Sequence, residues 1–153
     1  MIIPGTIIVS GLLMLLGVLM DDPANILPGL YRIVTMQDLL ITDYVYIAGV
    51  GATLVNLGLV TIVSIFLIKL SEEPLTLVEM GLMAGFSLFG KNLFNIWPII
   101  LGTWLYAKYQ KEPFGKYAGV ALLGTSLSPL VSYMALGSIH ASLLLGMVAG
   151  MVI

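Results

Sequence analysis

Three long runs without a charged residue constrain the fold of this chain more than any other feature. Ile2–Met20 is charge-free for 19 residues, Tyr44–Ile68 for 25 and Tyr117–Ile139 for 23. A helix needs about 20 apolar residues to cross the ~30 Å hydrocarbon core of a bilayer. The three runs therefore predict three long membrane-spanning helices.

The number of charged residues excludes a water-soluble domain. The chain has 153 residues, of which six are Lys or Arg and eight are Asp or Glu, whereas 59% are hydrophobic. Soluble domains carry about 25% charged residues because their surface faces water. The net charge of -2 argues against nucleic acid as a partner, and the absence of Cys excludes disulfides and thiolate metal sites. The expected partner is the lipid bilayer, and no cofactor is predicted.

Two shorter apolar stretches, 75–90 and 93–106, are separated by Lys91-Asn92. Each measures only ~21 to 24 Å as a helix, which lies between a short span and a re-entrant half-helix. The last apolar stretch, 140–153, ends without a polar tail, so we expect a truncated helix there. The fold predicted is an all-α polytopic membrane bundle, with three long spans, a short helical hairpin that spans twice or re-enters, and a partial last helix. The whole chain forms one transmembrane domain.

The segment 21–43 between the first two runs is expected to lie at the membrane interface. Apolar residues recur at helical spacing between Ile26 and Val34, and Thr35–Asp38 has the spacing of a capping box. Arg32 and Asp38 would be costly in hydrocarbon, so an interfacial helix or helix-turn-helix is favoured over a span.

Basic residues predict the orientation. Lys108, Lys111 and Lys116 share one connection, and Lys69 ends the second run on the same face. Lys and Arg in short loops are retained on the cytoplasmic side. We therefore expect a multi-pass protein of the cell membrane with a cytoplasmic amino terminus.

The polar string Lys91-Asn92-Leu93-Phe94-Asn95 is the strongest candidate site. A lysine at the bilayer centre costs at least ~3 kcal/mol and needs a partner or water. If the hairpin spans twice, Lys91 is a solvated tip beside Asp43. If it re-enters, Lys91, Asn92 and Asn95 lie at mid-membrane, level with Asn56. Irregular backbone at that depth is how transporters and channels build their sites.

Three other polar residues have alternative interpretations. Asn56 either hydrogen-bonds across helices, the commoner role, or lines a path. Glu79 is the one carboxylate inside a hydrophobic run and is a possible charge partner of Lys91, as is Asp43. Twelve helical residues would separate Glu79 from Lys91 by ~18 Å, so an interfacial position for Glu79 is favoured.

An enzyme is disfavoured by the motifs. Ser126 and Ser128 with His140 are the nearest approach to a nucleophile and base, but no acidic residue near His140 in sequence would orient it. No metalloprotease, P-loop or dinucleotide-binding motif occurs. A single His and no Cys argue against a metal site.

Several stretches resemble one known family. They are Leu40-Ile41-Thr42-Asp43-Tyr44, Gly85-Phe86-Ser87-Leu88-Phe89-Gly90-Lys91-Asn92-Leu93-Phe94-Asn95-Ile96-Trp97-Pro98, Leu105-Tyr106-Ala107-Lys108-Tyr109 and Gly124-Thr125-Ser126-Leu127-Ser128-Pro129. They are similar to multi-pass prokaryotic membrane proteins known as the domain of unknown function 1576. The resemblance implies that this chain matches one of two related halves, and it supplies no substrate.

The sequence thus predicts half of a small-solute transporter or channel, completed by a second copy of this chain or by a separate second half. Lys91, Asn92, Asn95 and Asn56 would form the solute site. The alternative is a non-transporting membrane scaffold or partner-binding subunit, in which Lys91 ends an outer hairpin.

Overall fold

The computed structural model describes residues 2–38, 41–71 and 87–153, and within these ranges every regular element is a helix. The helices are α1 (Ile2–Met20), α2 (Pro23–Thr35), α3 (Tyr44–Leu70), α5 (Trp97–Gln110), α6 (Gly115–Gly124), the 3-10 helix η1 (Thr125–Leu127), α7 (Ser128–Met134) and α8 (Ile139–Val152). Among them, α1 and α3 are long and apolar enough to cross a membrane. By length and composition alone, these two helices suggest a membrane protein.

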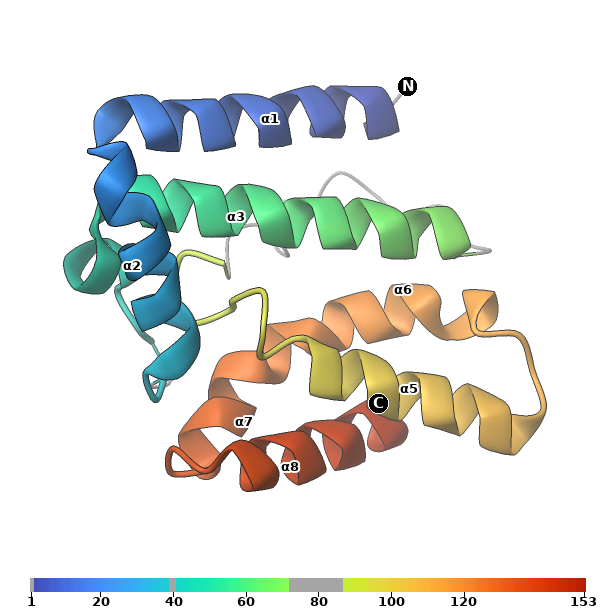
Figure 1. Ribbon diagram of the computed structural model, residues 1–153. Helices are drawn as coiled ribbons and strands as arrows, with labels where there is room; N and C mark the ends of the chain where they lie inside the picture. The colour runs from blue at the N-terminus through green and yellow to red at the C-terminus, as the bar shows by residue number, and fades with distance from the viewer. Residues whose placement is uncertain (1, 39–40, 72–86) are drawn as a thin grey trace.

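The helices form two groups that meet along α3 (Figure 1). In the first group α1 and α3 lie side by side, and α2 crosses them near the start of α3. In the second group α5 packs against α8 and α6, and α6 also contacts α3. The irregular segment 87–96 leads from the first group into α5, so it lies where the two groups meet.

Close backbone approach holds the second group together. A Cβ atom built on Gly150 would lie 2.1 Å from the Ile99 carbonyl oxygen, and one on Gly102 would lie 2.1 Å from that of Met147. Only glycine permits such contact between α5 and α8. The Gly146-x-x-x-Gly150 spacing therefore lies at a helix interface.

Carboxylates start two helices of the first group. Asp22 accepts a hydrogen bond from the Ala24 backbone N–H before α2, and Asp43 accepts one from the Tyr46 N–H before α3. These side chains satisfy backbone N–H groups that the first turn of each helix leaves unpaired. The sequence did not predict the break inside α3, where Gly49 has φ +85°. Residues with a Cβ rarely adopt that conformation.

Several predicted boundaries are wrong. The third long run is not one helix: α6, η1 and α7 divide it, and the helical path ends at Met134. The 3-10 helix ends at Leu127, shortly before Pro129, which lies in the first turn of α7 and has no N–H to continue an α-helical ladder. The run predicted to start at residue 93 begins as turns, and its helix is α5. The predicted helix 75–90 falls mostly outside the described residues.

The capping box predicted at Thr35–Asp38 is not formed. Thr35 is the last residue of α2, and its hydroxyl donates back to the Tyr31 carbonyl oxygen at 2.7 Å. Asp38 lies beyond the helix, and its side chain turns into the protein, where it is only 1% exposed. Thr35 and Asp38 have the spacing of a capping box, but the prediction that they cap a helix is wrong.

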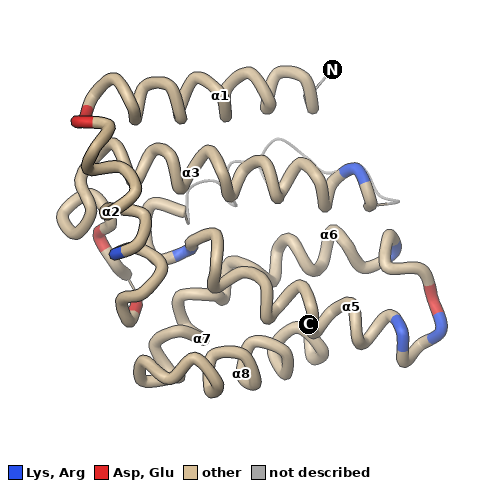
Figure 2. The backbone as a smooth tube through the Cα atoms, in the orientation of Figure 1, with Lys and Arg blue, Asp and Glu red and all other residues tan. Residues whose placement is uncertain are grey.

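Charged residues gather at helix ends and in connections, and α1, α7 and α8 carry none (Figure 2). The basic positions at the end of α3 and around the connection from α5 to α6 lie at the same end of the molecule, as the orientation argument assumed. In that connection Lys116 forms a 2.7 Å ion pair with Glu112.

Candidate functional site

The segment 87–96, here named the polar joint, brings the predicted site residues together. It contains no regular helix, yet Ser87 and Lys91 are 0% exposed and Asn92 is 2% exposed. Buried irregular backbone carries N–H and C=O groups that no helix satisfies, and these groups need other partners. In the polar joint asparagine side chains supply many of those partners.

Asn56 attaches the polar joint to the middle of α3. Its Nδ2 donates to the carbonyl oxygens of Ser87 at 3.3 Å and Lys91 at 3.2 Å, and its Oδ1 accepts from the Leu93 N–H at 3.2 Å. Asn56 is 1% exposed. The predicted meeting of Asn56 with Lys91 and its neighbours is therefore present, and it is made through the carbonyl oxygen of Lys91.

Asn92 attaches the polar joint to the end of α2 and the start of α3. Its Nδ2 donates to the Ile33 carbonyl oxygen at 3.2 Å and to the Tyr44 hydroxyl at 3.0 Å. Its Oδ1 accepts from the backbone N–H groups of Phe94 and Asn95, each at 2.9 Å. All four hydrogen bonds are internal, so this amide fixes the shape of the turn before α5.

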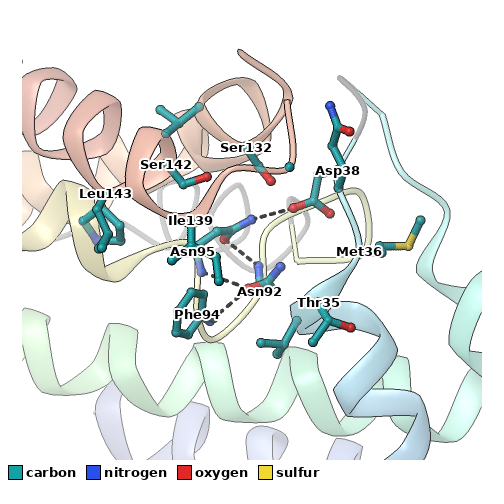
Figure 3. Close-up of a pocket in the computed structure, with 15 residues that line it drawn as sticks. Thr35, Met36, Asp38, Asn92, Phe94, Asn95, Ser132, Ile139, Ser142 and Leu143 are labelled. Carbon is teal, nitrogen blue, oxygen red and sulfur yellow. Dashed lines mark hydrogen bonds between the residues drawn. The ribbon is translucent and has the colours of Figure 1, made fainter. Parts of the chain in front are cut away.

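Asn95 completes the network and joins it to a carboxylate. Its Oδ1 accepts from the Asn92 N–H at 2.9 Å, and its Nδ2 donates to the Gly90 carbonyl oxygen at 2.7 Å and to Asp38 Oδ2 at 3.0 Å (Figure 3). Asp38 Oδ1 accepts from the Tyr44 hydroxyl at 2.7 Å. Sequence reasoning placed Asp38 at the interface and missed this role. The signal available was a carboxylate six residues before a tyrosine at a helix start.

The Lys91 side chain lies inside the protein. Its Nζ is buried and has no hydrogen-bond partner among the described residues. Lys91 is 0% exposed, in contrast to the solvated tip expected if the hairpin spans twice. Asp43, one predicted charge partner, is instead exposed and caps α3. Glu79, the other, lies outside the described residues.

A cavity of about 60 Å³ borders the polar joint. Asp38, Asn92 and Asn95 line it from one side, and Ser132 of α7 and Ser142 of α8 from the other (Figure 3). A cavity needs at least ~10–15 Å³ to hold one water molecule, so this cavity has room for several waters but not for a large solute.

The structure gives no support to the serines and histidine considered as nucleophile and base. Ser128 is buried, and its hydroxyl has no hydrogen-bond partner within the described ranges. His140 is exposed at the start of α8. The described residues include no group of three or more His, Asp or Glu side chains placed to hold a metal ion.

A profile of the family described as "Protein of unknown function (DUF1576)" matches residues 22–153. The chain belongs to this family. The match contains the whole polar joint, together with Asp38, Tyr44 and Asn56. Among curated proteins, and among solved structures, no match to the chain was found.

Proposed function

We propose that this DUF1576 chain is half of a small-solute transporter or channel of the cell membrane, with its solute site at the polar joint. The observation that supports the proposal is the buried Lys91 ammonium, which has no hydrogen-bond partner among the described residues. An uncompensated buried cation is costly, so a protein that keeps one usually pairs it with a charge, water or ligand. An anionic or strongly hydrogen-bonding solute would supply the missing acceptor.

The level of the polar joint supports the same proposal. Asn56 lies in the part of α3 that follows the break at Gly49, and it bonds directly to the Lys91 carbonyl oxygen. If this part of α3 spans the bilayer, the backbone of Lys91 lies within the hydrocarbon region, and irregular backbone survives there only when protein or a watery cavity surrounds it. Either a second copy or a separate second half would complete the path, with the amino terminus cytoplasmic.

Flux measurements test the proposal directly. Liposomes containing the wild-type protein are loaded with anionic and neutral hydrogen-bonding solutes, and efflux is compared with that of Lys91→Met and Lys69→Met. Lys69 is exposed at the end of α3 and serves as the matched control. We expect Lys91→Met to lose at least about tenfold in flux, the loss for a charge-assisted hydrogen bond of ~1.5–3 kcal/mol, and Lys69→Met to keep it. No flux for any solute, or equal flux in all three proteins, would refute the proposal.

The saturated asparagines favour a second candidate, a membrane scaffold or partner-binding subunit. Each of the three amides bonds to the chain itself, which is what a purely structural joint requires. Thiol labelling separates the candidates, because the chain has no Cys. A Lys91→Cys variant that reacts freely with an impermeant reagent from outside supports the scaffold, and protection or access from the cytoplasmic side alone supports the transporter. Lys69→Cys reports the reagent's access to the cytoplasmic face.

A further inference from the structure

The Asp38 carboxyl group is buried without a cationic partner in the described part of the chain. It lies in the connection between α2 and α3, outside both helices, and is 1% exposed. Its hydrogen bonds come from the Tyr44 hydroxyl, the Asn95 amide and the Ser132 hydroxyl, all of which are neutral. The one ion pair among the described residues joins Lys116 to Glu112. Buried carboxylates are ordinarily paired with a cation, so burial without one shifts the balance toward the neutral acid.

The cavity beside Asp38 gives this carboxyl group access to water. Asp38 is the one Asp, Glu, Lys, Arg or His among the fifteen described residues that line the cavity. The lining also includes exposed Thr35 and Gln37, so the cavity runs from the surface to the buried carboxyl group. Its volume of about 60 Å³ accommodates a short chain of waters.

We propose that Asp38 is a proton-binding site, which takes up a proton from the cavity water and releases it by the same route. On uptake, a proton leaves a hydronium ion in the cavity and bonds to a carboxylate oxygen, so the site changes from one negative charge to none. The new O–H needs an acceptor, and the Ser132 hydroxyl can change from donor to acceptor by rotating. Tyr44 and Asn95 remain as donors to the carboxyl group. This proposal does not depend on solute transport.

The donors around Asp38 favour a proton over a metal cation. Tyr44 directs an O–H at Oδ1 and Asn95 directs an N–H at Oδ2, so both oxygens already face positive ends of dipoles. A metal cation prefers several oxygen ligands, and it would be repelled by these hydrogens. The described side chains place no second carboxylate in the cavity.

None of the ionisable groups on the surrounding elements replaces Asp38 as the proton-binding group. Tyr44 on α3 donates to it; Arg32 on α2 and His140 on α8 are exposed. Lys91 on the polar joint has no hydrogen bond to Asp38. Burial raises the pKa of Asp38 from 3.8 to about 6, against the opposing effect of its hydrogen bonds with Tyr44, Ser132 and Asn95. Proton exchange at Asp38 therefore falls within the pH range that cells use.

Carboxyl-carbon NMR of the full-length protein, labelled at aspartate and reconstituted in nanodiscs, tests the proposal. The chain has four aspartates, which makes the titrations separable. We expect one signal with a midpoint near 6, absent from Asp38→Asn and retained in Asp43→Asn. Asp43 is the matched control because it is exposed and Asn also caps helices. A midpoint near 4 for Asp38, or no titration of Asp38 between about pH 4 and 8, overturns the proposal.

A second variant keeps the test decisive if Asp38→Asn fails to fold. Ser132→Ala leaves the carboxyl group in place but removes a donor that favours its charged form. We expect its midpoint to move above that of the wild type. An unchanged or lower midpoint contradicts the role of Ser132 as a donor to the charged carboxyl group, and a midpoint near 4 overturns the proton-binding site. Neither titration depends on flux, so the proton-binding proposal can be tested even if the transport proposal fails.

Discussion

Replacing Asn92 with alanine should remove much of the stability of the fold. The variant loses four hydrogen bonds, to Ile33, Tyr44, Phe94 and Asn95. At a net ~1 kcal/mol each, the loss is about 4 kcal/mol. Water in the neighbouring cavity can rescue some of the released N–H groups, which lowers the expected loss to ~3 kcal/mol. Whole domains are stable by only about 5–15 kcal/mol, so this is a large fraction.

Unfolding in mixed micelles, followed by the fluorescence of Trp97 and Trp104 on α5, measures this loss. Asn25→Ala is the matched control because Asn25 is exposed on α2, and we expect it to change the free energy of unfolding by less than ~0.5 kcal/mol. A double-mutant cycle of Asn92→Ala with Tyr44→Phe should show a coupling of about 1 kcal/mol, since these side chains bond directly. If Asn92→Ala costs less than ~1 kcal/mol, the polar joint is not held as described.

Three further predictions concern pH and helix contacts. Because burial raises the pKa of Asp38 from 3.8 to about 6, the folded state favours the protonated acid. The free energy of unfolding should therefore be largest below pH ~4 and fall by about 3 kcal/mol as the pH rises through 6, and Asp38→Asn should abolish this slope in a pH series of unfolding curves. Gly150→Ala should cost about 3 kcal/mol in the same unfolding assay because its Cβ would meet backbone of α5, whereas Gly5→Ala meets nothing and should be neutral or slightly stabilising. Ser10→Ala should cost ~0.6–1 kcal/mol by removing the 2.7 Å hydrogen bond to the Gly58 carbonyl oxygen, and a cost above ~3 kcal/mol would contradict that assignment.

The sequence predicts the long helices well because a single physical requirement determines them. The bounds of α1 agree with the predicted Ile2–Met20, and α3 starts at the predicted Tyr44. The length of a charge-free run and the position of a capping carboxylate are local features, so they can be read directly from the sequence. The break at Gly49 could not be read in this way, because a glycine inside an apolar run gives no local signal of a positive φ. In the structure, a Cβ on Gly49 would lie 2.7 Å from Asp21 Oδ2.

The candidate site was likewise predictable from the sequence only in part. The meeting of Asn56 with the polar joint was expected, from depth along a helix, only if the hairpin re-enters, and the structure contains that contact. The role of Asp38 did not follow, because its partners Tyr44, Asn95 and Ser132 come from three separate parts of the chain. The spacing of residues within one segment cannot reveal a carboxyl group whose hydrogen-bond donors lie in other parts of the sequence.

The polar joint has a consequence for the order in which the protein assembles. Its hydrogen bonds to residues outside the joint cross 31 to 59 positions of sequence, from Asn56 to Ser87 and from Ile33 to Asn92. During synthesis the amino-terminal part of the chain emerges first, so the amide of Asn56 and the carboxyl of Asp38 exist before their acceptors and donors on the joint are made. Until residue 95 is made, the side chains of Asn56 and Asp38 therefore lack their partners on the polar joint.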